Sequence, residues 1–434
     1  MPDSDRSPLA LFRHLRMDLR PLRDSRDFRY LMGSGVITMF GSFLTFVTIP
    51  LQMKQLTGSY VAVGLVSLAE FVPMVVFGLW GGAIADALDR RRVVLICEGG
   101  LALMAALLTL NALLPRPQVW ALYVIAALMA SLDSVQRPSL DAMVPRVVRH
   151  DQLTAAAALT SFRWNVGAIA GPALAGLIVA GFGPATTYGI DLLTYVVSMA
   201  LLWRVRAVPP RENAAPATLR SLAEGVRYAM GRPDLTGTYL VDMAAMFFAM
   251  SIALYPFLAD ELGAPKALGL LYSAGAVGAL LASLTSGWTR HVRRHGLAVI
   301  VAAMVWGLAV FLAALAPSLW AVFACLALAG AADMISGIFR TTIWDQTIPD
   351  ELRGRLAGIE LLSYSSGPML GNARAGLMAD LGGTRFSLGA GGLLCVGAVA
   401  LMSVLLPKFR TYDAETDEHA VAERTRRAAA PEPA

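Results

Sequence analysis

Several ionisable side chains lie inside long apolar stretches of this sequence, where a charge has little water around it. Asp133 and Arg137 stand four residues apart in one stretch, Asp333 and Arg340 share another, and Glu70 is central in a third. Four-residue spacing places Asp133 and Arg137 on one face of a helix, within reach of an ion pair. An ionisable group at the centre of a bilayer costs about 2.5–3.5 kcal/mol on insertion scales, so such groups usually face a cavity or each other.

Carboxylates in this setting are suited to proton coupling. A carboxylate that exchanges an arginine partner for a proton links proton binding to the movement of a helix. We hypothesise that Asp133, Asp333 or Glu70 carries a coupling proton. A static ion pair that joins two helices, and a hydrogen-bonded carboxyl that faces a wet cavity, are the alternatives, and the sequence leaves all three open.

The sequence carries no signature of an enzyme or of a metal site. It contains no Gly-x-x-x-x-Gly-Lys phosphate loop and no nucleophile with a recognisable base. Its five histidines fall in the tails or between apolar runs, and its three cysteines fall inside apolar runs without ligand-like spacing. We therefore expect no catalytic residue, no metal and no cofactor.

The composition is that of a membrane protein. Of 434 residues, 56% are hydrophobic and 15% are charged, against about 25% charged in typical soluble domains, and the mean hydropathy is +0.59. A soluble protein of this size has too little interior to hide so much apolar surface. The net charge of +5 does not indicate nucleic-acid binding, because the basic residues lie in short segments between apolar runs.

Long apolar runs account for most of the chain. A helix that crosses the hydrocarbon core needs about 20 predominantly apolar residues. The sequence predicts an all-α integral membrane protein with twelve transmembrane helices: Tyr30–Met53, Ala62–Ala85, Val93–Leu114, Val119–Met143, Thr154–Ala180, Thr186–Trp203, Leu235–Leu258, Leu268–Thr289, Ala298–Ala316, Ser318–Trp344, Leu356–Leu381 and Phe386–Leu406.

Basic residues between the runs predict the orientation of the chain. With the N-terminus inside, the cytosolic loops contain most of the arginines, whereas the opposite face holds Lys54, Arg116, Lys266 and Arg385. This asymmetry follows the positive-inside rule through all twelve spans. We therefore predict a multi-pass protein of the cytoplasmic (inner) membrane with both termini in the cytosol.

The chain divides into two halves that repeat one pattern. Asp141 and Pro145 stand at the end of the fourth span with the spacing that Asp345 and Pro349 show at the end of the tenth. Parallel repeats of this kind place a substrate site between the halves, near the bilayer midplane. The predicted units are a basic cytosolic segment (1–29), a six-helix bundle (30–203), a cytosolic central loop (204–234), a second, pseudo-symmetric six-helix bundle (235–406) and a disordered cytosolic tail (407–434).

Two loops between spans carry patterned charge, and the resemblance described below implies that they form a cytosolic gate. Their members are Gly82, Asp86, Asp89, Arg90 and Arg91 after the second span, and Asp345, Arg353 and Arg355 after the tenth. A carboxylate such as Asp86 can accept bonds from a helix N-terminus, and the arginines can clamp acidic groups or lipid phosphates. An ordinary positively charged loop is the alternative interpretation.

The fifth predicted span contains small residues at helical spacing. They are Gly167, Gly171, Pro172 and Gly176. Small residues four apart allow helices to pack closely, and proline bends a span. Generic helix packing explains the pattern equally well.

These features, in this order, resemble major facilitator superfamily transporters over residues 28–406. The loop beginning at Gly82 resembles the superfamily's signature loop, and the Gly167–Gly176 pattern resembles its antiporter motif. Pro349-Asp-Glu-Leu-Arg-Gly-Arg355 resembles a loop of the branch of drug:proton antiporters that contains enterobactin (siderophore) exporters and macrolide efflux carriers. Ala87, Asp89 and Ala175 depart from the common patterns. The resemblance implies alternating access and proton-driven export, with the gate loops latching the two halves together.

The sequence is therefore compatible with three functions. The first is a proton antiporter that exports an amphipathic small molecule, such as a drug, a macrolide or a siderophore-like metabolite. The second is a facilitator or importer of a small metabolite on the same fold, and the third is a non-transporting membrane sensor or scaffold. For the first, the expected partners are the substrate, protons and membrane lipids, with no nucleic acid, and the protein is expected to function as a monomer.

Overall fold

The computed structural model describes residues 18–208 and 227–429, without the side chains of residues 79–87, 350–355, 357–362 and 364. The predicted central loop therefore lies largely outside the described residues, as do residues 1–17 and 430–434. Within the described ranges the regular structure is entirely helical.

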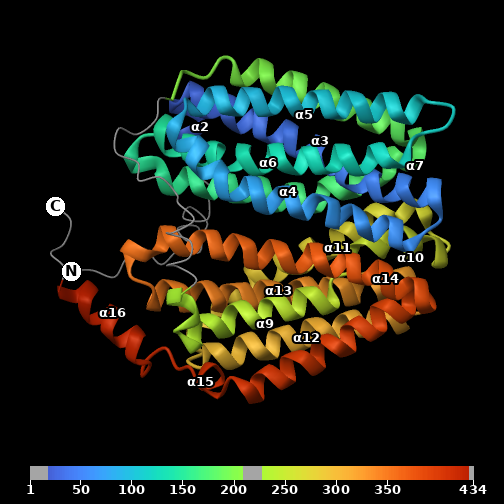
Figure 1. The fold of residues 1–434 in the computed structure, drawn as a ribbon. Coiled ribbons are helices and arrows are strands. Elements are labelled where there is room, and N and C mark those ends of the chain that lie inside the picture. Colours follow the sequence, from blue (N-terminus) through green and yellow to red (C-terminus); the bar gives the residue numbers. More distant parts are fainter. Residues whose placement is uncertain (1–17, 209–226, 430–434) are drawn as a thin grey trace, which may run out of the picture.

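The helices of the first half form one bundle (Figure 1). Their bounds are α2 Arg20–Asp24, α3 Arg26–Thr57, α4 Tyr60–Ala87, α5 Arg90–Leu113, α6 Val119–Val147 and α7 Leu153–Leu202. The helices of the second half form another bundle. Their bounds are α9 Pro233–Ala249, α10 Tyr255–Glu261, α11 Leu268–Leu284, α12 His295–Leu315, α13 Leu319–Thr347 and α14 Asp350–Leu405.

Two of the helices each contain two membrane spans. Ten described segments are long and apolar enough to cross a membrane, but α7 is interrupted at Gly183 (φ +76°) and α14 at Gly383 (φ +84°). Only glycine adopts this left-handed backbone without strain. Each interruption falls in a gap that the sequence predicts between two spans, so the ten segments comprise the twelve expected crossings and confirm the all-α membrane fold.

The two bundles meet through closely packed glycines. A Cβ atom added to Gly64 of α4 would lie 2.8 Å from the Asn372 carbonyl oxygen of α14. One added to Gly176 of α7 would lie 2.4 Å from the backbone nitrogen of Gly269 in α11. Helix backbones approach this closely only where side chains are absent, so these glycines fix how the bundles join.

The chain after residue 407 corrects one prediction, because it is folded rather than disordered as far as Ala429. It forms α15 (Pro407–Arg410) and α16 (Glu418–Ala429). The buried ring of Phe409 occupies the space left by Gly237 of α9, and Arg427 of α16 donates a hydrogen bond to the Asp345 carbonyl oxygen at 2.9 Å. Burial of this aromatic ring holds the tail against the second bundle, which its charged composition does not reveal.

Candidate functional site

The seventh span is broken where it enters the middle of the protein. Helix α9 ends at Ala249 and α10 begins at Tyr255. The amide of Ala253 donates to Asn372 Oδ1 at 3.1 Å, and Arg374 donates to the Met250 carbonyl oxygen at 3.3 Å. Irregular backbone at membrane depth is tolerated where protein groups satisfy it or where it lines a cavity. Both conditions hold here, and they give Arg374 a structural role.

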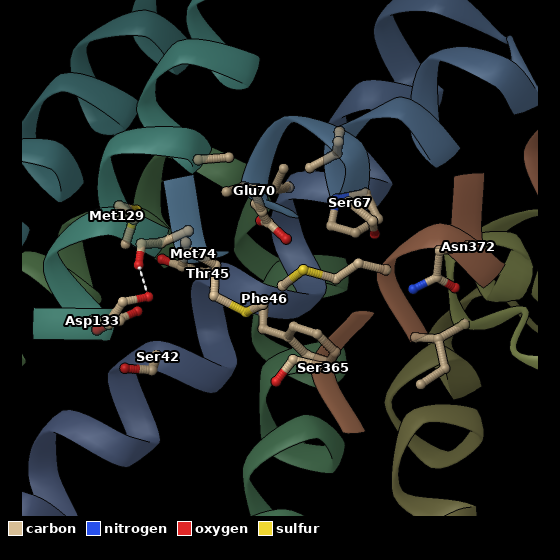
Figure 2. Close-up of a pocket in the computed structure, with 18 of the residues that line it drawn as sticks. Ser42, Thr45, Phe46, Ser67, Glu70, Met74, Met129, Asp133, Ser365 and Asn372 are labelled. Carbon is tan, nitrogen blue, oxygen red and sulfur yellow. Dashed lines mark hydrogen bonds between the residues drawn. The ribbon is translucent and has the colours of Figure 1, made fainter. Parts of the chain in front are cut away.

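A cavity of about 590 Å³ lies between the bundles beside this break. Its wall combines α3, α4, α6 and Tyr195 of α7 in the first bundle with Ile252 and Ala253 at the break, Tyr272 of α11, and part of α14. Figure 2 shows labelled residues of both bundles around it, among them Glu70 and Asp133 of the first bundle and Asn372 of the second. The cavity is therefore shared between the two repeats.

Among the residues whose side chains are described, the charged part of the cavity wall comes from the first bundle. Three predicted residues, Glu70 of α4 with Asp133 and Arg137 of α6, line the cavity together with Asp141. The second bundle contributes neutral groups, including Ser365 and Asn372. Much of the remaining wall is apolar and is made by Phe46, Met74, Met129 and Met369, among others. The arrangement can hold an amphipathic molecule with its polar groups toward the acidic side.

The ion pair that spacing allows between Asp133 and Arg137 is not formed among the described residues. The Arg137 guanidinium instead lies over the ring of Trp164 in α7, with its central carbon 5.7 Å from the ring centroid. A cation above an aromatic face is attracted by the ring's quadrupole. The Asp133 carboxylate is consequently left facing the cavity without an arginine in direct contact.

Two other predicted residues, Asp333 and Arg340, belong to a separate cluster in the second bundle. Arg340 of α13 forms an ion pair with Asp242 of α9, and its guanidinium is 3.9 Å from the Asp333 carboxylate. These residues do not line the central cavity. Asp242 was not among the predicted site residues, and its only sequence signal is its position inside an apolar run.

Two further buried carboxylates in the first bundle were also missed. Asp191 of α7 and Glu98 of α5 are 0% and 2% exposed. Asp191 accepts hydrogen bonds from Thr45 and, at 3.2 Å, from Thr194. Glu98 accepts from Gln136 at 3.0 Å and from a threonine of α3 at 3.3 Å. Both lie within apolar runs, which is the signal that singled out Asp133.

The described part of the first gate loop stabilises its own bundle. The Asp89 side chain caps α5 by accepting a hydrogen bond from the Arg92 amide at 3.0 Å. The Arg90 amide donates to the Val208 carbonyl oxygen at 3.1 Å, and the Arg91 side chain donates to carbonyls at the end of α7. These contacts join the start of α5 to the end of α7.

Four members of the predicted gate fall on residues whose side chains are not described. Gly82 and Asp86 belong to α4, and Arg353 and Arg355 belong to α14. Their predicted contacts lie outside the described residues. The remaining member, Asp345, accepts the hydrogen bond from Arg427 noted above through its backbone carbonyl.

The small residues of the fifth span form two sets of close contacts. A Cβ atom at Gly167 would overlap Met39, and one at Gly171 would overlap Phe43, both in α3. On the other side, the carbonyl oxygen of Pro172 and the backbone of Gly176 lie against Gly269 of the second bundle. The predicted motif therefore packs both within its bundle and across the boundary between bundles.

Comparison with known proteins identifies related sequences. Residues 17–430 match the family described as transmembrane secretion effector. Enterobactin exporter EntS of Shigella boydii serotype 18 (strain CDC 3083-94 / BS512) is 29% identical over 398 residues, which cover 91% of this chain and 96% of that protein. Enterobactin exporter EntS of Escherichia coli O139:H28 (strain E24377A / ETEC) shows the same identity and coverage.

Solved structures share the fold at lower identity. The nucleoside transporter NupG has a TM-score of 0.68 and 14% identity, covering 89% of this chain and 100% of that one. A bacterial homologue of the iron transporter ferroportin, in an inward-facing state, has a TM-score of 0.66 and 16% identity, with 89% and 99% coverage. A POT family transporter in complex with 5-aminolevulinic acid has a TM-score of 0.69 and 12% identity, with 89% and 97% coverage.

Proposed function

The chain belongs to the transmembrane secretion effector family of the major facilitator superfamily, and we propose that it exports an amphipathic small molecule across the cytoplasmic membrane by proton antiport. The named relatives are enterobactin exporters, which favours a siderophore-like metabolite. A macrolide or another amphipathic drug fits the same class of chemistry.

The central cavity is the observation that carries this proposal. Its volume of about 590 Å³ lies within the range of about 300–1,000 Å³ that is usual for small-molecule sites. Methionine and phenylalanine side chains in its wall adapt to different apolar shapes, and the acidic residues of one bundle orient polar groups. Both bundles contribute to the wall, as expected of a carrier with its site between repeats.

Coupling is assigned to the carboxylates that the substrate reaches. Asp133 and Glu70 both line the cavity, so a proton bound there competes directly with a cationic or hydrogen-bonding substrate. Asp333 is placed differently, beside the Arg340–Asp242 ion pair. That cluster fits the alternative role of a static pair that joins α9 to α13, and we therefore rank Asp133 and Glu70 above Asp333.

Alternating access would open the end at which the bundles are joined. Besides the glycine contacts, Lys54 of α3 forms an ion pair with Asp260 of α10 and donates a hydrogen bond to the Pro256 carbonyl oxygen at 2.7 Å. With both termini in the cytosol, this latch is on the external face, and the conformation is closed toward the outside. Release of the substrate then requires these contacts to separate.

The proposal is tested by accumulation in everted membrane vesicles with an imposed proton gradient. Enterobactin, a macrolide and a fluorescent lipophilic cation are each assayed with wild type, Asp133→Asn and Glu70→Gln, and Asp333→Asn is the matched control outside the cavity. We expect uncoupler-sensitive uptake that either cavity variant abolishes and the control retains. Uptake that does not depend on the proton gradient would indicate a facilitator. Uptake lost only in Asp333→Asn would assign proton coupling to the second bundle.

A further inference from the structure

The buried carboxyl of Asp191 lies one layer behind the cavity wall. It belongs to the part of α7 that follows Gly183, and it points at α3. Its two oxygens accept hydrogen bonds from the hydroxyls of Thr45 and Thr194. Both partners are neutral, and the residue is fully buried. Thr45 both lines the cavity and donates a hydrogen bond to this carboxyl.

The backbone of α3 makes room for this carboxyl. A Cβ atom at Gly41 would lie 2.3 Å from Asp191 Oδ1 and 2.0 Å from Thr194 Oγ1. Glycine is therefore the residue that lets the two helices approach while a carboxyl sits between them. The packing of α3 against α7 therefore leaves a space that the Asp191 carboxyl fills.

No cation faces Asp191 among the described residues. Within their spans the surrounding helices carry the acids Glu70 of α4, Glu98 of α5 and Asp133 of α6, and the two basic residues Arg137 of α6 and Arg163 of α7. Arg137 lies over Trp164 and Lys54 pairs with Asp260, whereas the Arg163 guanidinium lies against Gly35. Among the described residues none of the three forms an ion pair with Asp191. A buried carboxylate without a counter-charge takes up a proton in preference to remaining ionised.

A short hydroxyl path connects this carboxyl to the cavity. Thr45, Ser42 and Tyr195 all line the cavity, and the oxygens of Ser42 and Tyr195 are 3.4 Å apart. Thr45 is thus part of the cavity wall, and its hydroxyl donates a hydrogen bond to Asp191. A proton can pass when a protonated cavity water (H3O⁺) gives its proton to Thr45 Oγ1 while Thr45 gives its own to Asp191 Oδ2, which leaves a neutral water, an unchanged threonine and a neutral carboxyl.

We propose that Asp191 is a proton-binding residue, occupied in this conformation and in exchange with the central cavity through the Thr45 hydroxyl. Its role in coupling rests on the proposed antiport function, whereas the proton site itself does not. The site differs from Asp133 and Glu70 because the substrate cannot touch it. It can hold a proton while the cavity is filled, and the state of that proton alters the contact between α3 and α7.

Infrared spectroscopy of the purified full chain tests the site without any transport. At pH about 7, where an ordinary aspartate with a pKa of about 3.9 is ionised, wild type should show a protonated-carboxyl C=O band that Asp191→Asn lacks. Thr45→Val, which keeps the shape and removes the donor, should shift this band and slow its exchange in D2O. Thr48→Val is the matched control, because the Thr48 hydroxyl is equally buried in α3 but donates to the Leu44 carbonyl oxygen.

Each result bears on a separate part of the proposal. Identical spectra of wild type and Asp191→Asn would overturn the site, and a band that Thr45→Val leaves unmoved would overturn the route. Vesicle uptake of the fluorescent cation should lose its dependence on the proton gradient in Asp191→Asn and keep it in Thr48→Val. Gradient-dependent uptake in Asp191→Asn would overturn the coupling role alone. If wild type accumulates none of the three probes, the proposed function fails while the infrared result stands.

Discussion

The contact between Gly176 and Gly269 predicts how a single methyl group changes the conformation of the protein. In Gly176→Ala the new Cβ atom would lie 2.4 Å from the Gly269 nitrogen and 2.7 Å from its Cα atom. Non-bonded heavy atoms prefer about 3.5–4.0 Å, so α7 and α11 must separate by about 1 Å. Both atoms met by the methyl group are backbone atoms, and no side-chain rotation can relieve the overlap.

The magnitude follows from the usual cost of overpacking, which is about 1–3 kcal/mol. In the proposed alternating-access cycle Gly176 and Gly269 are in contact only while the bundles are joined at this end, so the cost would fall on this conformation and not on the opposite one. A difference of about 1–3 kcal/mol shifts a two-state equilibrium about 5- to 150-fold. We expect the population opened at this end to rise by a factor in that range.

Single-molecule fluorescence between labels at positions 116 and 266 measures the opening, because these exposed loop residues belong to different bundles. Gly181→Ala in the same helix is the matched control, since a Cβ atom there meets nothing within 4 Å. The reasoning is refuted if Gly176→Ala folds normally and shows the same distance distribution as the control.

Other predictions concern stability. Asp242→Asn removes the closer of the two carboxylates beside the buried Arg340 guanidinium and leaves Asp333 at 3.9 Å. It should destabilise the protein by about 3 kcal/mol, the lower end of the usual cost of breaking a buried ion pair. An unchanged Tm in a thermal unfolding assay in detergent would contradict this prediction. Phe409→Ala removes the ring packed at Gly237 and should cost about 3–5 kcal/mol, and limited proteolysis should cut the tail faster than in wild type. Burial raises the pKa of Tyr412. At pH above about 10 the phenol is therefore still neutral in the folded protein, whereas it is ionised in the unfolded chain. Stability should therefore fall as the pH rises beyond that value, and Tyr412→Phe should make the fall shallower; equal slopes would exclude this contribution.

The spans could be predicted from the sequence because the bilayer imposes one requirement, a long apolar run, on every helix. Even the interruptions at Gly183 and Gly383 fall in predicted gaps. The same logic singled out Glu70, Asp133 and Asp333, since a charge in an apolar run must face water or a partner. It could not tell these cases apart: Glu70 and Asp133 line the cavity, whereas Asp333 lies beside Arg340.

Partnerships between distant helices were not predictable in the same way. The period and spacing of apolar residues indicate which face of a helix is buried. They do not indicate which other helix that face packs against. Arg340 pairs with Asp242 across α9 and α13, and Asp191 meets Thr45 across α7 and α3. The folded tail was missed for a related reason, because its anchor is one ring, Phe409, that fits where glycines leave space.

Proton flux in proteoliposomes tests the central claim most directly. Purified protein is reconstituted into liposomes that enclose a pH-sensitive dye. A concentration gradient is then imposed across their membrane, using the compound that accumulates most strongly in the everted vesicles. We predict that protons move in the direction opposite to the substrate. The double variant Asp133→Asn/Glu70→Gln should abolish this proton movement, and Asp333→Asn should retain it. Substrate that crosses the membrane in the wild type without any proton movement would contradict antiport.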